Sequence, residues 1–276
     1  MHDSTGTTST DPKLRFWRAG DTGPRVLLIM GYRMRGIVWE PQINGLKANH
    51  QVAWFDNRGV GESEAGEKPR WTMNDMAQDA RAVMDSLGWE TCHLVGVSMG
   101  GMVAQELALQ SPERLATLSL IVTHAGGYTI EKVPTLKGLR AFRKVGRPNL
   151  NERIEALKSL LYTEEFLATV DEETLAERMK KRIGMPPAKT TAMGQLNAIV
   201  RHNAGRRLKH LQLPTLIIKA GRDILVRPSA SDRLRKLIPH SKLVEIADAG
   251  HGVTFQGAER VNQALAQHFA HSLTAV

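Results

Sequence analysis

A serine lies between glycines in the stretch Gly96-Val97-Ser98-Met99-Gly100-Gly101. The apolar run Cys92 to Val95 precedes it, and Met102 to Ala108 follows as a helix-like segment. A strand that turns directly into a helix crowds the backbone, so small neighbours are needed for the serine side chain to project from the turn. The N–H of Met99 would then lie at a helix N-terminus, where unpaired donors and the helix dipole favour negative charge. The stretch predicts either a reactive serine beside an oxyanion site or a glycine-rich turn that only packs a helix on a strand.

The length and composition are those of one large globular domain, with room for an insertion: 276 residues, 42% hydrophobic and 24% charged. No apolar run approaches the roughly 20 residues that span a bilayer. The first residues, Met1 to Asp11, are rich in Ser and Thr and lack the apolar core of a secretory signal, so we expect a cytoplasmic protein with a short disordered start. The single cysteine, Cys92, excludes an internal disulfide and is expected to be a small core residue.

Strand-like and helix-like stretches alternate along most of the chain. Strands are expected at an edge position over Lys13 to Arg18, and then at Val26 to Met30, Val52 to Asp56, Leu118 to Val122, Pro214 to Lys219 and Leu243 to Ile246. Helices are expected at Asn74 to Leu87, after Ser98, at Ser229 to Leu237 and at Phe255 to His271. This order predicts an α/β fold, with a mainly parallel sheet covered by helices on both faces.

The alternation stops between residues 125 and 209, where helical stretches are expected and no convincing strand is found. We interpret this segment as a helical cap inserted into a core made of residues 1–124 and 210–276. It contains 17 Lys and Arg against 9 Asp and Glu, so it carries nearly all of the net charge of +9.

A serine hydroxyl needs a positioned base, and the base needs a third group to orient it. His251 follows the strand that ends at Ile246, at the carboxyl edge of the sheet, where open α/β sheets place their sites. Asp223 follows another strand at the same edge and could approach the imidazole from behind. Its competitor, Asp248, is expected to brace its own turn. The sequence therefore predicts Ser98, Asp223 and His251 as a catalytic set.

A second oxyanion donor is expected from the loop after Val26 to Met30. Gly31 leaves the backbone bare there, and Tyr32 can present its N–H beside that of Met99. Two such donors can each contribute on the order of 3 kcal/mol to lowering the barrier. The alternative is an ordinary turn at the end of a strand.

Taken in order, these motifs resemble the α/β-hydrolase superfamily over nearly the whole chain. The resemblance is carried by Leu28-Ile29-Met30-Gly31, Phe55-Asp56-Asn57-Arg58-Gly59-Val60-Gly61-Glu62-Ser63, the Ser98 stretch, Ser111-Pro112-Glu113-Arg114-Leu115, Gly221-Arg222-Asp223, Gly250-His251 and Glu259-Arg260-Val261-Asn262. The chain is most similar to capped hydrolases that include enol-lactonases, small carboxylesterases and anthracycline methylesterases. The resemblance implies Ser98, Asp223 and His251 as triad, and the N–H groups of Tyr32 and Met99 as oxyanion hole.

The chain departs from the family pattern at Met30-Gly31, where many relatives have His-Gly, so a polar brace of the oxyanion loop is missing. The expected function is serine-dependent hydrolysis of a carboxylic ester or lactone through an acyl-enzyme. The same constellation serves carbon–carbon bond hydrolases, acyltransferases and cofactor-free oxygenases, and a non-catalytic small-molecule receptor could share the fold. The oligomeric state is not readable from the sequence.

Neither a metal nor a cofactor is expected, because the sequence has no HExxH motif, no Cys/His cluster and no phosphate-binding loop. The turn at Asp56 to Gly59 is interpreted as structural. Candidate pocket walls, equally plausible as core residues, are Met34, Trp39, Tyr128 and Met193.

Six cations and no acid lie between residues 132 and 151: Lys132, Lys137, Arg140, Arg143, Lys144 and Arg147. This stretch is either a solvated helix face or a surface that steers an anionic substrate toward Ser98. Nucleic acid is not expected as a partner, because the stretch lacks interleaved aromatic residues and any nucleic-acid-binding motif.

Steering of an anionic substrate by these cations can be tested kinetically. The kcat/KM for a carboxylate-bearing ester should fall with added salt more steeply than the kcat/KM for a neutral ester, because salt screens the attraction between separated charges. Initial rates across a NaCl series measure both slopes. Equal slopes would contradict steering.

Overall fold

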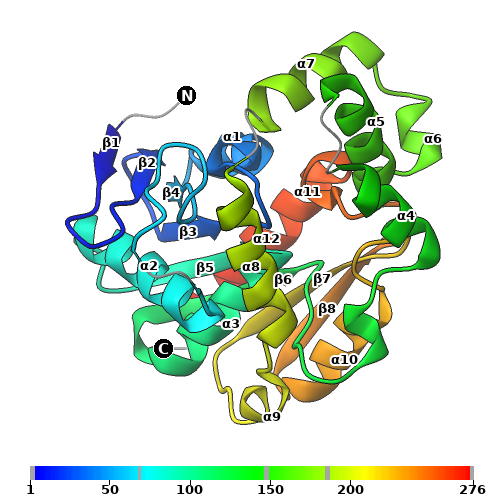
Figure 1. Ribbon diagram of the computed structural model, residues 1–276. Coiled ribbons are helices and arrows are strands. Elements are labelled where there is room, and N and C mark those ends of the chain that lie inside the picture. The colour runs from blue at the N-terminus through cyan, green and yellow to red at the C-terminus, as the bar shows by residue number, and fades with distance from the viewer. Residues whose placement is uncertain (1–3, 68–69, 146–148, 184–186, 274–276) are drawn as a thin grey trace.

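The computed structural model describes residues 4–67, 70–145, 149–183 and 187–273, and its centre is an eight-stranded sheet (Figure 1). The strands are β1 (Ser4–Thr7), β2 (Arg15–Ala19), β3 (Arg25–Ile29), β4 (Gln51–Phe55), β5 (Cys92–Val97), β6 (Leu115–Ile121), β7 (Thr215–Ala220) and β8 (Ser241–Ile246). Their order is β1-β2-β4-β3-β5-β6-β7-β8, and all pairs from β4 to β8 are parallel. The predicted α/β-hydrolase architecture is confirmed.

The N-terminal edge of the sheet differs from expectation. Residues 4–7 form β1, which pairs antiparallel with β2, so the prediction of a disordered start is wrong for these residues and β2 is not the edge strand. The buried hydroxyl of Thr8 accepts a hydrogen bond from the N–H of Leu14 at 2.9 Å and fixes the return of the chain. Ser and Thr fit a half-exposed edge strand, although they resemble a flexible tail in composition.

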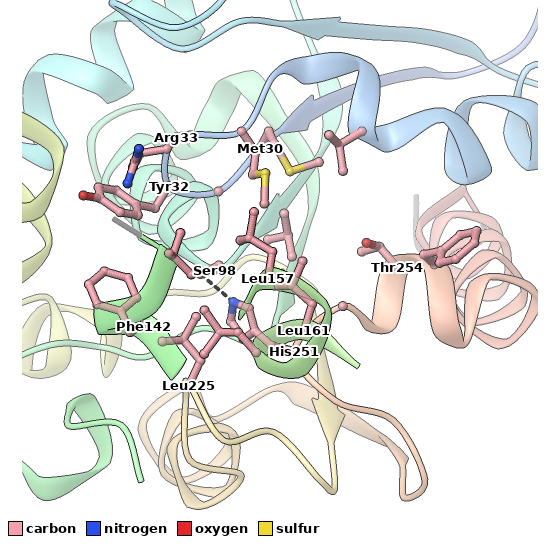
Figure 2. A pocket seen from close by; sticks show the side chains of 18 of the residues that line it. Met30, Tyr32, Arg33, Ser98, Phe142, Leu157, Leu161, Leu225, His251 and Thr254 are labelled. Carbon is pink, nitrogen blue, oxygen red and sulfur yellow. Dashed lines mark hydrogen bonds between the residues drawn. The ribbon is translucent and has the colours of Figure 1, made fainter. Parts of the chain in front are cut away.

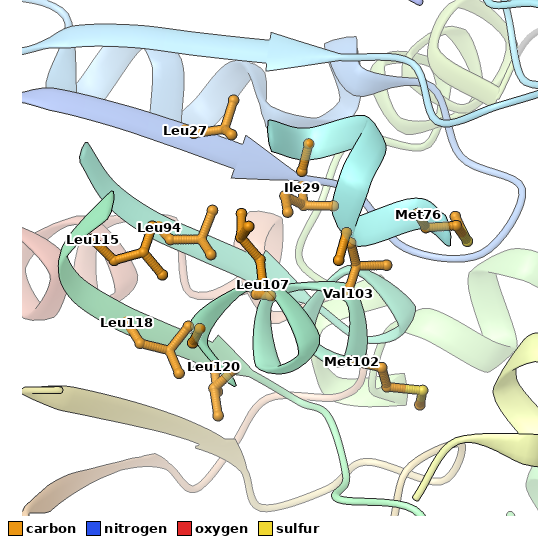
Figure 3. Packing of buried hydrophobic residues seen from close by; sticks show 14 of the residues in the cluster. Leu27, Ile29, Met76, Leu94, Met102, Val103, Leu107, Leu115, Leu118 and Leu120 are labelled. Carbon is orange, nitrogen blue, oxygen red and sulfur yellow. The ribbon is translucent and has the colours of Figure 1, made fainter. Parts of the chain in front are cut away.

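Helices cover both faces of the sheet, as predicted (Figure 1). One face packs against α2 (Met73–Ser86), α3 (Met99–Gln110) and α10 (Ser229–Leu237). Leu27 and Ile29 of β3 and Leu94 of β5 meet Val103 and Leu107 of α3 in this layer (Figure 3). The other face packs against α1 (Glu40–Leu46) and α12 (Ala258–Leu273). The helix predicted over Phe255 to His271 is divided into two helices. The first, α11 (Val253–Gln256), ends at Gly257, and α12 begins at the next residue.

The segment 125–209 is helical in its described part, where the extended pairing consists of one isolated bridge between Gly126 and Asn203. Its helices are α4 (Leu136–Val145), α5 (Leu150–Leu161), α6 (Glu164–Leu167), α7 (Glu172–Ile183), α8 (Lys189–Arg201) and α9 (Gly205–Leu208). A separate apolar cluster centred on α5 and α7 holds part of it together. In the described chain, no helix is long and apolar enough to cross a membrane.

Both ends of this segment are tied to α3. The side-chain amide of Gln105 donates to the carbonyl of His124 at 3.2 Å, and its oxygen lies 3.1 Å from Nε2 of His202. Glu106 accepts two hydrogen bonds from Arg207, at 2.6 and 2.7 Å. Burial raises the pKa of Glu106, but hydrogen bonds from His202 and Arg207 outweigh it and bring the pKa to about 2. The helix that begins after Ser98 thus also anchors the entry and exit of the helical segment.

We expect the buried histidine of β5, His93, to make the fold less stable in acid. Burial, followed by the charges of His50 and His268, lowers the pKa of His93 to about 4 from 6.5. The folded state therefore binds this proton more weakly than the unfolded chain. The stabilisation is fully present above pH 6.5 and is lost as the pH falls from 6.5 toward 4, by about 3 kcal/mol at most.

Urea unfolding at intervals between these pH values tests the prediction. The free energy of unfolding of His93→Gln should fall less steeply with decreasing pH than that of the wild type. His240→Gln, at an exposed histidine, should keep the wild-type slope. An unchanged slope in His93→Gln would contradict the assignment.

Candidate active site

Ser98 occupies a sharp turn between β5 and α3, and its backbone lies in the left-handed region with φ of 54° and ψ of −120°. Its N–H donates to the carbonyl of Ile121 at 2.9 Å. Its carbonyl accepts from the N–H of Gly101 at 3.0 Å and from the hydroxyl of Thr123 at 2.7 Å. These bonds fix the turn from both sides, so the half-buried side chain projects in one direction.

The two flanking glycines are required sterically. A Cβ at Gly96 would come within 2.3 Å of the carbonyl oxygen of Gly100, and a Cβ at Gly100 would come within 2.1 Å of that of Ile29. Real Cβ atoms essentially never approach other heavy atoms so closely. The requirement for small neighbours, argued from the sequence, has these backbone contacts as its cause.

Backbone strain gathers at the carboxyl edge of the sheet. Among the described residues, three that are not glycine have positive φ: Arg33 at 61°, Ser98 at 54° and Val122 at 42°. They follow the neighbouring strands β3, β5 and β6. Such conformations cost on the order of 1–3 kcal/mol each and persist where the surrounding structure fixes them.

A continuous hydrogen-bonded chain joins the serine, the histidine and the aspartate (Figure 2 shows the first link). Nε2 of His251 lies 3.0 Å from Oγ of Ser98, and Nδ1 lies 2.7 Å from Oδ2 of Asp223. The other carboxylate oxygen of Asp223 accepts from the N–H groups of Leu225 and Val226 at 2.8 and 2.9 Å. Because Nδ1 faces a carboxylate, the neutral ring carries its proton there, and Nε2 can accept from the serine.

Asp248 takes the structural role expected for it. Its carboxylate is exposed and accepts from Arg260 at 2.6 and 3.0 Å. Its carbonyl accepts from the side chain of Gln256, which also accepts from the N–H of Gly250. These contacts brace the loop that carries His251.

The loop after β3 lies directly against the serine. A Cβ at Gly31 would stand 3.2 Å from Cβ of Ser98, so the bare backbone allows this approach without crowding. In the described part of the chain, no acceptor pairs with the N–H of Tyr32 or of Met99. Both donors are therefore free to bind an oxygen atom.

Other contacts replace the polar brace that Met30-Gly31 lacks. The amide of Asn57 donates to the carbonyl of Met30 at 2.9 Å, and the N–H of Arg33 donates to Oε1 of Gln195 in α8 at 2.9 Å. Asp56 accepts from the N–H of Gly36 at 2.6 Å. The loop is thus held by its own sheet and by the helical segment.

The rest of the Asp56 turn is structural, as expected. Arg58 is buried with Asp79 and donates to both of its carboxylate oxygens, at 2.6 and 2.7 Å. Its guanidinium also lies 5.7 Å from the centre of the Trp71 ring. This pair ties the turn to α2.

A largely apolar cavity opens above Ser98 and His251 (Figure 2). Its other lining residues are Met30, Gly31, Tyr32, Arg33, Met34, Val38, Val97, Phe142, Val145, Arg153, Leu157, Leu160, Leu161, Tyr162, Pro187, Leu225, Gly252, Thr254 and Phe255. The carboxyl edge of the sheet supplies the floor, and the neighbouring helices α4 and α5 supply part of the wall.

Of the four candidate wall residues, Met34 lines this cavity. The prediction is wrong for the other three, which are not among the described lining residues. Trp39 is fully buried in the core between the sheet, α1 and α12. Tyr128 and Met193 point into solvent, with exposures of 101% and 71%. An apolar side chain in the sequence can lie in a pocket wall, in the core or at the surface, and only tertiary packing decides between these places.

The cations of α4 are separate from the cavity. Arg140, Arg143 and Lys144 are exposed, Lys137 pairs with Glu164 at 2.7 Å, and Arg147 lies outside the described residues. Lys132, before α4, lies 5.5 Å from the centre of the Tyr128 ring. The cations that do line the cavity, Arg33 and Arg153, were not identified from the sequence.

Comparison with known proteins identifies the family of the chain. A family model described as the alpha/beta hydrolase fold matches residues 24–258. RutD of Caulobacter vibrioides, which is named as a carbamate hydrolase, is 30% identical over 240 residues, or 87% of this chain and 88% of its own. The chain therefore belongs to the alpha/beta hydrolase fold family, and its class is that of a hydrolase.

Solved structures show the same fold. A thermophilic esterase from Thermogutta terrifontis, with malate bound, superposes with a TM-score of 0.81 at 27% identity, covering 98% of this chain and 99% of the esterase. The enol-lactonase from Burkholderia xenovorans LB400 gives 0.82 at 20% identity, covering 97% and 100%. The family and fold expected from the sequence are confirmed.

Within the described residues, no group of three or more His, Cys, Asp or Glu could hold a metal ion.

The Asn57 brace gives a stability prediction. In Asn57→Ala the buried carbonyl of Met30 loses its donor, so the free energy of unfolding should fall by about 1–3 kcal/mol. Asn49→Ala, at an exposed asparagine, is the matched control and should leave it within about 0.5 kcal/mol. Urea unfolding measures both, and equal effects in the two variants would exclude a special role for the brace.

Proposed function

We propose that the protein is a serine hydrolase that cleaves a carboxylic ester or lactone through an acyl-enzyme intermediate. The observation that carries this proposal is the chain of hydrogen bonds from Ser98 through His251 to Asp223, at 3.0 and 2.7 Å. Nucleophile, base and orienting acid stand in the order that acyl transfer requires. The serine also faces a cavity that can receive a substrate.

In the first half-reaction, Oγ of Ser98 attacks the substrate carbonyl carbon while Nε2 of His251 takes the hydroxyl proton. Asp223 stabilises the imidazolium and keeps the ring oriented. The C–O bond to the leaving alcohol then breaks, and His251 returns the proton to the departing oxygen. In a lactone the released alcohol stays attached to the acyl group.

In the second half-reaction, His251 takes a proton from water as the water oxygen attacks the acyl-enzyme carbonyl. Collapse of the tetrahedral intermediate releases the carboxylic acid, and the proton returns to Ser98. In both intermediates the N–H groups of Tyr32 and Met99 hold the oxyanion. Their freedom from other acceptors and the contact of Gly31 with Ser98 support this role.

The helical segment 125–209 acts in this proposal as the cap of the site. Phe142 and Val145 of α4 and Leu157 of α5 line the cavity, so this segment selects the substrate. An acyl or alcohol group with apolar surface fits that lining. Carbamate cleavage, suggested by the name of RutD, would use the same three residues, but a small polar carbamate would leave most of the apolar wall without contact.

Burst kinetics with an activated ester test the proposal. The wild type should release one equivalent of alcohol rapidly and then turn over, and Ser98→Ala should lower kcat by about 1,000-fold or more. Ser159→Ala, at an exposed serine of α5, should turn over like the wild type. An undiminished rate in Ser98→Ala would refute the assignment.

Labelling separates the enzyme from a receptor. A fluorophosphonate probe should attach to Ser98 in the wild type and not in Ser98→Ala. Labelling without turnover of esters, lactones or carbamates would favour a non-catalytic receptor. Cleavage of a carbon–carbon substrate, transfer to an added alcohol or oxygen uptake would each identify one of the other reactions open to this site.

A further inference from the structure

Two positive charges stand in the wall of an otherwise apolar cavity. Of the described lining residues, Arg33 and Arg153 are the two with a permanent charge, and none is Asp or Glu. Both side chains are half-buried. Neither pairs with a carboxylate anywhere in the described chain. A charge partly removed from water without a counter-ion is costly, so it favours a ligand that brings one.

The backbone of Arg33 is held in position, and its guanidinium lies beside an aromatic ring. Its backbone has φ of 61°, a conformation that few non-glycine residues adopt, and its N–H is bonded to Gln195. The guanidinium carbon lies 5.8 Å from the centre of the Tyr32 ring (Figure 2). A guanidinium fixed on an aromatic ring keeps its remaining N–H donors available in a planar fork.

Arg153 lines the same cavity from α5. In α5 it precedes Leu157, Leu160 and Leu161 by four, seven and eight residues, which places all four on one helix face, and all four line the cavity. The carbonyl of Leu161 accepts from the N–H of Gly252, next to His251, at 2.6 Å. At 1.5 Å per residue, Arg153 begins roughly 12 Å along the helix from that contact. This face of α5 therefore begins near His251, continues over the leucines and ends at Arg153.

We propose that Arg33 and Arg153 form a subsite for a substrate carboxylate, and that the substrate is an ester or lactone whose carboxylate is separated from the scissile carbonyl by an apolar linker. The leucine face of α5 contacts the linker, and the arginines bind the carboxylate by charge-assisted hydrogen bonds. This assignment of substrate class rests on the proposed hydrolase function. It differs from steering by the exposed cations of α4, because the arginines contact the bound substrate.

A matched pair of substrates tests the subsite. Para-nitrophenyl hydrogen adipate carries a free carboxylate, and methyl para-nitrophenyl adipate has the same chain with the charge removed. The wild type should have the higher kcat/KM for the free acid. In Arg33→Met and in Arg153→Met, the ratio of the two kcat/KM values should fall about 10- to 100-fold, the effect of losing a charge-assisted contact.

Arg140→Met is the matched control, because Arg140 is an exposed arginine of α4 outside the described cavity lining. It should keep the wild-type ratio in high salt, which screens the field of the exposed α4 cations. A fall in Arg140→Met equal to that in the cavity variants would show bulk electrostatics instead of a subsite. An unchanged ratio in both cavity variants would overturn the proposal.

A binding measurement separates failure of the subsite from failure of the proposed hydrolysis. In a Ser98→Ala background, calorimetry with the non-hydrolysable diacid adipate should give a Kd that Arg33→Met or Arg153→Met raises about tenfold or more. Weaker binding in these variants supports the subsite even if the wild type hydrolyses neither ester. Equal Kd values in all three proteins would overturn it even if neutral esters are hydrolysed.

Discussion

The left-handed backbone of Ser98 is the constraint on which the site depends. With φ of 54°, the chain leaves β5 and enters α3 without an intervening loop, so the serine stands at the carboxyl edge of the sheet. The turn persists because Ile121, Gly101 and Thr123 satisfy its backbone groups, and because Gly100 can lie against the carbonyl of Ile29. The strain at one residue is offset by contacts with β6 and the residue Thr123 that follows it, with α3 and with β3.

The same turn sets the start of α3, and α3 then organises much of what surrounds the site. Its apolar face packs on β3 and β5, and Gln105 and Glu106 hold the two ends of the helical segment. The helical segment in turn holds the loop after β3, since Gln195 bonds the N–H of Arg33. Ser98, the loop after β3 and the helical segment beside the cavity are thus connected through one helix, and a displacement of α3 would affect all three.

The sequence predicts features whose causes are local. Buried parallel strands are continuous apolar runs, and Ser98, Asp223 and His251 each follow such a strand, so the topology alone brings them to one edge of the sheet. Features set by long-range packing are not predictable in this way. Trp39 suits a pocket wall as well as a core, Tyr128 suits either and lies in solvent, and the pairing of β1 depends on where β2 lies. Arg33 and Arg153 are 120 positions apart, and only the packing of α5 over the loop after β3 shows that they share a cavity.

The exposed cations of α4 and the two arginines of the cavity would act on an anionic substrate in different ways. The exposed cations of α4 contribute a field that falls off within a Debye length of roughly 10 Å in ordinary salt, and that field treats all anions alike. Arg33 and Arg153 lie where apolar walls exclude part of the water. There a guanidinium favours a substrate whose carboxylate can reach it over a substrate whose carboxylate lies elsewhere. An apolar wall alone accepts many acyl chains, because each methylene contributes similarly wherever it lies. In the proposed subsite the two half-buried arginines orient the substrate, since they determine which end of it lies away from Ser98.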